Sequence, residues 1–267
     1  MFPGAGADRD EAAYAIVGAP LDSSTTFQPG TRFGPRLLEH VAEAFSDYDH
    51  HTGLRFTECS VHDHGEIRPG DDAEEYLEFL RGTLWDYQQE GVVPLVVGGE
   101  HTVTVAGIRG LDPDVYVCLD AHLDLRESYA GNPLSHATVT HHALDVVDEV
   151  VLLGARTGSE AGWDRADTDE RVTVVPPEAV ASWEPDFDGE QVYLSVDIDA
   201  ADPGFAPGTG TPEPFGLEPR TMHEVLRAVA PDCVGFDVVE VNDRDDGQAA
   251  TLGAKLLRAF VFAHANG

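Results

Sequence analysis

The stretch VYVCLDAHLD (residues 115–124) joins an apolar run to three ionisable side chains. Its first five residues are continuously apolar, as in a parallel strand that helices cover on both faces. Asp120, His122 and Asp124 follow at every second position, so an extended backbone directs them to one side. Burying several carboxylates close together is costly unless positive charge lies between them. The stretch therefore predicts a buried strand that ends at a cation site.

Six further stretches share this apolar character and predict strands of the same sheet. They are YAIVGA (14–19), VPLVVGG (93–99), EVVLLGA (149–155), VTVVPP (172–177), QVYLSVDID (191–199) and CVGFDVVEV (233–241). Apolar residues recur at helical spacing in three segments between or after them, 73–90, 219–230 and 247–265. This alternation predicts an α/β fold with a parallel sheet and helices on both faces. No linker interrupts the pattern, so we expect a single domain over residues 1–267.

The chain is strongly acidic, with 16 Lys and Arg against 49 Asp and Glu, which gives 16 − 49 = −33. Such a charge repels nucleic acid and anionic membranes. Disorder is one interpretation of it, but the apolar periodicity argues against disorder. A solvated acidic shell on a folded protein from a high-salt cytoplasm is the other interpretation. Salt relieves the self-repulsion there, because the Debye length is about 3 Å at 1 M.

Other features of the composition predict a cytoplasmic location. No stretch of about 18 apolar residues is present, so no membrane span is expected. The N-terminal residues MFPGAGADRD lack the basic and apolar regions of a signal peptide. The three cysteines, Cys59, Cys118 and Cys233, form no CxxC pair and leave an odd one over, which is typical of reduced, buried thiols.

Three other predicted strands also end in polar side chains. These are His101 in VVGGEHTVT (96–104), Asp197 and Asp199 in SVDID (195–199), and Glu240 in DVVEVN (237–242). Taken singly, each has a simpler interpretation as a loop histidine or a surface carboxylate. Taken together they predict a metal site, because a parallel sheet gathers the carboxyl ends of its strands at one edge.

The candidate ligands indicate which metal to expect. They are two imidazoles and four carboxylates with no thiolate: His101, Asp120, His122, Asp124, Asp197 and Asp199. This set is too large for one tetrahedral zinc and suits two hard or borderline cations bridged by carboxylates. A manganese pair fits the ligand type best. Two such ions about 3.5–4 Å apart lower the pKa of a shared water towards neutrality.

Over essentially its whole length the chain resembles the ureohydrolases of the arginase and agmatinase superfamily. The resemblance is carried in order by GTRFGP (30–35), GGEHT (98–102), DAHLDLR (120–126), SHAT (135–138), SVDIDAADPGFAPGTGTPEP (195–214) and DVVEVN (237–242). It implies a three-layer α/β/α fold around an eight-stranded, mostly parallel sheet. It also implies a binuclear manganese centre and a trimeric or hexameric homo-oligomer.

The resemblance further implies how two Mn²⁺ ions are held. One ion would be bound by His101, Asp120, Asp124 and Asp197, and the other by His122, Asp120, Asp197 and Asp199. Asp120 and Asp197 would then bridge the ions. Asp124 would also orient the bridging hydroxide that attacks the guanidinium carbon, and the reaction would release urea and a primary amine.

Three further residues resemble substrate-contacting positions of the family. Glu240 resembles the guanidinium-binding glutamate, because a carboxylate matches the paired N–H donors of a guanidinium. His136 resembles the histidine that contacts substrate and protonates the leaving amine, and imidazole titrates in the right range for this. Asn132 belongs, with Arg126 and Tyr129, to a loop that is similar to that of agmatinases. The simpler interpretations are a surface carboxylate for Glu240 and a loop histidine for His136.

Agmatine is the favoured substrate and putrescine the expected product. Ala137 and the HHALD segment (141–145) depart from the agmatinase pattern, so arginase, guanidinobutyrase and formiminoglutamase activities stay open. Formiminoglutamate would release formamide instead of urea. Two alternatives come from other classes. One is a metal-binding scaffold without turnover, and the other is a zinc deacetylase on a related fold, which would use one metal and lack the 195–214 block.

Overall fold

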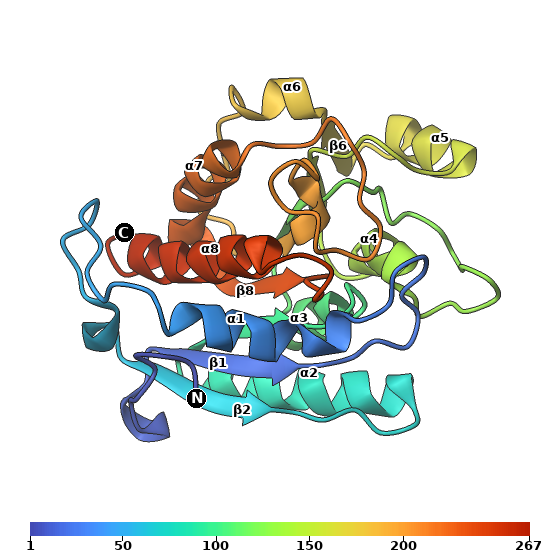
Figure 1. Ribbon diagram of the computed structural model, residues 1–267. Helices are drawn as coiled ribbons and strands as arrows, with labels where there is room; N and C mark the ends of the chain where they lie inside the picture. Colours follow the sequence, from blue (N-terminus) through green and yellow to red (C-terminus); the bar gives the residue numbers. More distant parts are fainter.

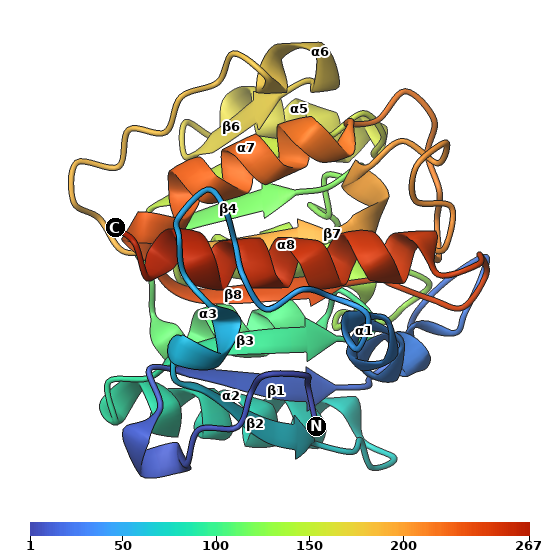
Figure 2. The same ribbon diagram turned by 60° about the vertical axis from the view of Figure 1, so that its left-hand side comes forward.

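The computed structural model describes residues 1–267 and forms one eight-stranded sheet between two layers of helices (Figure 1). The strands are β1 (Tyr14–Ala19), β2 (Val61–Glu66), β3 (Val93–Gly98), β4 (Val115–Leu119), β5 (Glu149–Leu153), β6 (Val172–Val175), β7 (Val192–Asp197) and β8 (Cys233–Val239). Every strand pairing is parallel, in the order β2-β1-β3-β8-β7-β4-β5-β6. Figure 2 shows this order from β2 at the bottom to β6 at the top. The three-layer arrangement is confirmed, and the sheet is entirely parallel.

Helices cover both faces of the sheet. They are α1 (Gly34–Ala42), α2 (Ala73–Gln89), α3 (Val103–Leu111), α4 (Val139–Ala143), α5 (Glu160–Thr168), α6 (Pro177–Val180), α7 (Pro219–Val229) and α8 (Gln248–His264). Short 3-10 turns span Arg9–Glu11, Thr31–Phe33, Phe56–Glu58, His136–Thr138, Ile198–Ala200 and Ala230–Asp232. Leu38 of α1, Met222 of α7 and Phe260 of α8 share one hydrophobic core. Leu80 of α2 and Ile108 of α3 belong to a second core on the opposite face.

Local sequence explains the two long helices. The Asp72 side chain caps α2, because it accepts hydrogen bonds from the backbone N–H groups of Glu74 (2.9 Å) and Glu75 (3.1 Å). Helix α8 lies across the middle of the sheet (Figure 2). The Phe260 ring stacks on Phe236 of β8 with centroids 4.6 Å apart. The observed bounds match the helical segments expected at 73–90 and 247–265 to within one residue at each end.

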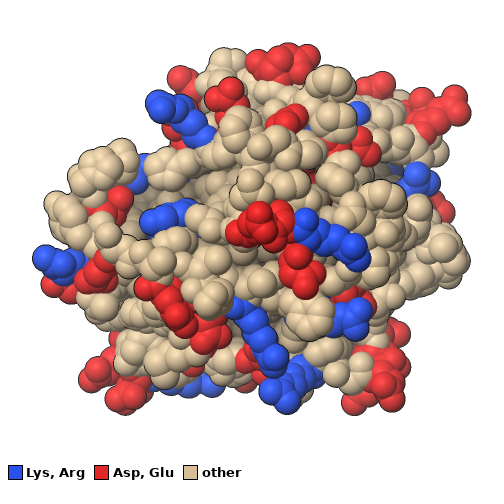
Figure 3. Space-filling view, viewed as in Figure 1, with Lys and Arg blue, Asp and Glu red and all other residues tan.

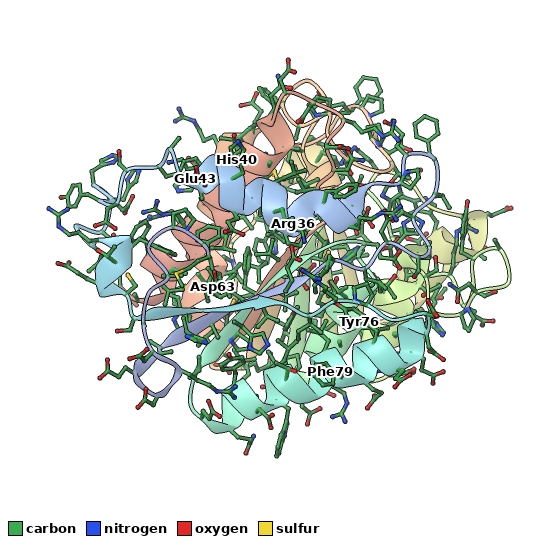
Figure 4. The ribbon with its side chains drawn as sticks, turned by 60° about the horizontal axis from the view of Figure 1, so that its bottom comes forward. Arg36, His40, Glu43, Asp63, Tyr76 and Phe79 are labelled. Carbon is green, nitrogen blue, oxygen red and sulfur yellow. The ribbon has the colours of Figure 1, made fainter.

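The edge strand β2 is the one strand that the apolar pattern does not predict. Its sequence, VHDHGE, is mostly polar because β2 pairs with β1 alone and is only partly buried. In Figure 4, Asp63 of β2 lies near Arg36 of α1. The Asp63 carboxylate accepts a hydrogen bond from the backbone N–H of Phe2, and the N-terminal segment bridges to β2 at His62. Charged side chains and this segment protect the exposed edge.

Acidic side chains are spread over the surface. Figure 3 shows Asp and Glu distributed across one face, with arginines between them. Several arginines of the chain are in ion pairs, such as Arg9 with Glu90 at 2.8 Å and Arg36 with Glu66 at 2.9 Å. None of the helices combines the length and the hydropathy that crossing a membrane requires.

Candidate metal centre and active site

Four neighbouring strands end at the candidate site. In the sheet, β3, β8, β7 and β4 lie side by side, and their carboxyl ends lead into His101, Glu240, Asp197 and Asp120 respectively. All four side chains are buried. The sheet order thus brings together residues that lie up to 139 positions apart in the chain. This is the edge at which open α/β sheets bind their ligands.

His101 faces three carboxylates through one ring nitrogen. Its Nδ1 lies 3.0 Å from Asp124 Oδ2, 3.2 Å from Asp120 Oδ2 and 3.6 Å from Asp197 Oδ2. None of these contacts has hydrogen-bond geometry, so the buried Nδ1 has no partner in the protein. Burying such an atom without a partner is costly, and a cation between the imidazole and the carboxylates would supply the missing interaction.

His122 forms a second cluster beside the first. Its Nδ1 lies 3.0 Å from Asp199 Oδ2 and 3.5 Å from Asp120 Oδ1. Asp120 therefore faces His122 with one oxygen and His101 with the other. Backbone N–H groups fix the other acids, because Asp199 Oδ1 accepts from Ala121 N at 3.0 Å and Asp197 Oδ1 accepts from Asp199 N at 2.8 Å. All six predicted ligands lie in these two adjoining clusters.

The electrostatics of the clusters fit a cation. Burial raises the pKa of Asp197 well above its usual range, and repulsion from Asp199 and Asp120 adds to this. Burial also raises the pKa of Asp124, with further repulsion from Asp120. For Asp120 burial opposes ionisation, but the nearby imidazoles of His101 and His122 hold its pKa below the usual value. The positive charge that two imidazoles can carry does not balance the negative charge of four buried carboxylates. Imidazole and carboxylate donors together suit borderline or hard divalent cations.

A hydrogen-bond chain fixes the orientation of His101. Its Nε2 lies 3.2 Å from Ser195 Oγ, which donates to Asp237 Oδ1 at 2.6 Å. Tyr193 and Thr104 also donate hydroxyl hydrogen bonds to Asp237, at 2.8 and 2.7 Å. Because the Ser195 proton points to Asp237, Ser195 Oγ accepts from Nε2–H. The contact with Ser195 favours the tautomer in which Nδ1 carries no proton and can bind a cation, while the Tyr116 hydroxyl also lies 3.2 Å from Nε2.

Ser195 and Asp237 support His101 through these hydrogen bonds, but the sequence motifs did not single them out. Asp237 lies in the middle of the apolar run CVGFDVVEV and is completely buried. A carboxylate inside a buried strand is rare unless it is paired. A carboxylate within an apolar run could therefore have pointed to Asp237. Nothing in the sequence distinguishes Ser195 from a buried serine that has no role in the site.

The loop that carries His101 is tied to the segment after β1. Gly99 is essential there, because a Cβ atom would lie 1.9 Å from the carbonyl oxygen of Leu21. The next residue, Glu100, is completely buried and its carboxylate accepts from Ser24 N (2.6 Å) and from the Thr102 hydroxyl (2.6 Å). These contacts hold the backbone of the GGEHT block in one position, and with it the imidazole.

Two acidic residues of the site have strained backbones. Asp124 has φ 48° and Glu240 has φ 63°, which is the left-handed region that residues other than glycine seldom adopt. Hydrogen bonds hold both turns, because the Asp124 carbonyl accepts from His141 N (3.1 Å) and Glu240 N donates to the Gly99 carbonyl (2.8 Å). Strain of this kind, about 1–3 kcal/mol per residue, is often found at functional sites.

Glu240 and His136 lie next to each other. Glu240 Oε1 accepts from His101 N at 2.8 Å and lies 3.9 Å from His136 Nδ1. Its second oxygen, Oε2, is buried and has no partner, and burial raises the pKa of this carboxyl well above its usual range. The His136 backbone N–H donates to Ser24 Oγ at 3.0 Å, and its Nε2 lies 3.3 Å from Thr26 Oγ1.

A cavity of about 180 Å³ opens onto this region. Its lining includes Thr26, His122, Asp124, Arg126, Tyr129, His136 and Thr211. Glu240 lies behind His136 and is not part of the lining. Asn132 is also outside it, because this exposed side chain bonds within its own turn, to the carbonyl (2.6 Å) and N–H (3.0 Å) of Leu134. The substrate contact predicted for Asn132 stays a prediction.

Arg156 holds the polypeptide around Asp199 and was not identified from the sequence. Its guanidinium donates to the backbone carbonyls of Asp199 (2.8 Å), Glu213 (2.7 Å), Gly154 (3.0 Å) and Pro214 (3.1 Å). One side chain thus joins the end of β5, the 198–200 turn and the loop that precedes α7. Its planar array of N–H donors can reach several carbonyls at once, which a lysine ammonium cannot.

Arg156→Met should lower the free energy of unfolding by about 2–4 kcal/mol, because several carbonyls lose their donor together. Chemical denaturation at constant salt measures the change. Arg220→Met is the matched control, since Arg220 is exposed on α7 and has no ion pair. Equal free energies of unfolding in the two variants would contradict the stabilising role of the Arg156 hydrogen bonds.

Comparisons with known proteins agree with this geometry. The model of the Arginase family matches residues 12–263. An agmatinase from Pyrococcus horikoshii is 32% identical, covering 94% of this chain and 91% of that protein. A guanidinobutyrase from Pseudomonas aeruginosa is 34% identical, covering 94% and 86%. The crystal structure of the agmatine ureohydrolase of Thermoplasma volcanium superposes with a TM-score of 0.92 at 29% identity, covering 99% and 94%. The chain therefore belongs to the arginase family of ureohydrolases.

Proposed function

We propose that this chain, acting as one ureohydrolase domain, hydrolyses a linear guanidine compound to urea and a primary amine with two Mn²⁺ ions bound. The observation that carries the proposal is that six candidate ligand side chains from three strand ends, five of them buried and His122 partly exposed, converge around Asp120, whose two carboxylate oxygens face His101 and His122. A scaffold without turnover would not need the buried Glu240 oxygen that lacks a partner, nor His136 beside it.

The two clusters divide the metal ligands between two positions. One ion would be held by His101, Asp120, Asp124 and Asp197, and the other by His122, Asp120, Asp197 and Asp199. When bound, the ions supply Lewis-acid charge that makes water nucleophilic near neutral pH. The hydrogen bond from Nε2 of His101 to Ser195 keeps Nδ1 available as a ligand. The six candidate ligands are enough for two metal ions, which disfavours a deacetylase that binds a single zinc ion.

Three side chains are proposed to act on the substrate and the attacking water. Asp124 lines the cavity, and its carboxylate would accept a hydrogen bond from the water and orient it. Glu240 would bind the guanidinium through Oε2, the oxygen that has no partner in the protein. His136 lines the cavity 3.9 Å from Glu240, so its imidazole would lie beside the guanidinium and protonate the leaving amine.

Agmatine is the proposed substrate and putrescine the product. The Pyrococcus horikoshii relative is named an agmatinase, and the −33 charge of this chain attracts a dication. A guanidino acid is the second candidate, because Arg126 lines the cavity and lies 5.3 Å from the Tyr129 ring, where it would meet a carboxylate. The guanidinobutyrase relative supports this second candidate.

A product assay tests the proposal. Protein loaded with Mn²⁺ in molar KCl is incubated separately with agmatine, 4-guanidinobutyrate, arginine and formiminoglutamate, and urea and formamide are measured. Urea is expected from agmatine with the highest kcat/KM. A higher value for 4-guanidinobutyrate would replace the substrate while keeping the reaction. Release of neither product from any of the four would refute the proposed activity.

Glu240→Gln should lower kcat/KM by about 10- to 100-fold, since losing a hydrogen bond to a charged group costs about 1.5–3 kcal/mol. Glutamine keeps the shape and can still accept from His101 N, so the fold should survive. Steady-state kinetics measure the effect, with the exposed Glu218→Gln as the matched control. Unchanged constants in Glu240→Gln would remove Glu240 from the substrate site.

Low salt should inactivate the protein. At −33 the folded chain repels itself, and the Debye length grows from about 3 Å at 1 M to about 30 Å at 0.01 M salt. We expect urea release and far-UV circular dichroism to fall together as KCl is removed by dialysis. Full activity in dilute buffer would contradict the proposed adaptation to high salt.

A further inference from the structure

A second group of metal-binding side chains lies outside the active site, in the segment DYDHHTG (47–53). One ligand atom each of Asp49, His50 and His51 can be chosen so that all three lie within 4.8 Å of one another. The His50 and His51 ring centroids are 3.9 Å apart. In Figure 1 this segment, called the hairpin below, lies at the left, near the C-terminus. Strands β1 and β8 point to the right, towards the edge that carries the active site.

A third imidazole approaches the same group from a helix. His223 of α7 is partly buried, and its ring centroid lies 5.9 Å from that of His51. The group therefore combines a carboxylate with three imidazoles, from two elements that are far apart in the sequence. Imidazole and carboxylate together suit borderline first-row divalent cations such as Ni²⁺ and Zn²⁺.

The nitrogens of these imidazoles have no other use in the protein. Of the twelve histidines, eight have a hydrogen-bond or carboxylate partner through the ring. The four without one are His40, His50, His51 and His223. Three of these four meet at the hairpin, so their donor atoms are free for a ligand.

The hairpin holds its carboxylate in place. Asp49 Oδ2 accepts from Thr52 N (2.9 Å) and from the Thr52 hydroxyl (2.8 Å), which leaves Oδ1 without a protein partner. Asp49 N donates to the Leu54 carbonyl at 2.9 Å, and Arg258 of α8 donates to the Asp47 carbonyl at 3.2 Å. A ligand residue whose backbone is already fixed loses little entropy when it binds an ion.

We propose that Asp49, His50 and His51 bind a borderline divalent transition-metal cation, with His223 as the fourth ligand, and that this ion links the hairpin to α7. The acidic surface concentrates cations near the hairpin. The positive charge of Arg227 on α7 acts on Asp49 and His223 and opposes the binding of a cation there. The site is separate from the two clusters of the active site and shares no residue with them.

Metal counting on the Mn²⁺-loaded protein tests the site. After equilibrium dialysis against excess Mn²⁺ with micromolar Ni²⁺, nickel per chain is measured by mass spectrometry for the wild type and variants. His50→Gln and His51→Gln should each bind one nickel ion fewer per chain than the wild type. His40→Gln is the matched control, because His40 is exposed and also lacks a partner but lies on α1, and it should bind as much as the wild type.

Two further measurements decide the roles of the ligands. His223→Gln should shift the nickel titration to at least about tenfold higher concentration. Nickel should raise the melting temperature of the wild type and leave that of His51→Gln unchanged, because only a ligand of the native state stabilises it. Equal nickel content in the wild type and His51→Gln would overturn the proposal. Urea release is expected to be equal in the two, which shows that the variant is folded.

Discussion

Asp124→Asn is expected to abolish urea release while the chain stays folded. Asp124 lines the cavity, and its Oδ2 lies 3.0 Å from His101 Nδ1 within the first ligand cluster. The substitution removes the negative charge and replaces one of the two acceptor oxygens by an NH₂ donor. Asparagine tolerates the left-handed conformation in which the structure places residue 124 (φ 48°), so the turn should persist. We expect kcat to fall by at least about 10³-fold, since nucleophile activation and charge stabilisation are lost together.

Three measurements on Asp124→Asn separate chemistry from folding. Urea release gives kcat, mass spectrometry gives manganese per chain, and thermal unfolding gives the melting temperature. The control is Asp145→Asn, because Asp145 is an exposed acid near the end of α4. A variant that binds the full complement of manganese and still turns over at a near-normal rate would rule out the orienting role of Asp124.

His136→Asn should lower kcat by about 10²–10⁴-fold, the usual contribution of a positioned acid or base. The imidazole lines the cavity with its Nε2 3.3 Å from Thr26 Oγ1, and the backbone N–H of His136 donates to Ser24 Oγ. Because the His136 imidazole is proposed to protonate the leaving amine, kcat should change more than KM. Added imidazole should partly restore the rate, since a small molecule can occupy the vacated space.

His142→Asn is the control for this substitution. His142 lies nearby on α4, but its Nε2 is 2.8 Å from the carbonyl of Pro133 and it does not line the cavity. It should leave kcat nearly unchanged. A loss below about tenfold in His136→Asn, or a loss of equal size in His142→Asn, would assign the proton to another donor.

The local pattern of the sequence was enough to identify most of the sheet. Seven of the eight strands read as apolar runs because helices cover them on both faces. The strand β2 was missed because its sequence, VHDHGE, carries the polar residues of a sheet edge. The short helices α1 and α3 were also not predicted, because nine residues hold too few turns for a clear period.

The residues that support the site were harder to find than the ligands. The candidate ligands stand directly after apolar runs, so the local sequence was enough to single them out. Ser195, Asp237 and Arg156 act through contacts with residues that lie 42 to 94 positions away, or through several backbone carbonyls at once. Such contacts leave no period or spacing in the sequence. The side chain of Asn132 shows another limit, since its motif was recognised but its hydrogen bonds within its own turn could not be read from the sequence.

By itself, the sequence determined that the chain forms a parallel sheet, which side chains stand at its strand ends, and that they suit a pair of hard or borderline cations. These properties depend on side-chain type and on alternation along one strand, and both are local. Only the tertiary structure decided that β3, β8, β7 and β4 are neighbours, so that His101 and His122 face one shared Asp120. The tautomer of His101 and the strained turns at Asp124 and Glu240 were decided there too, because hydrogen bonds between distant segments hold them.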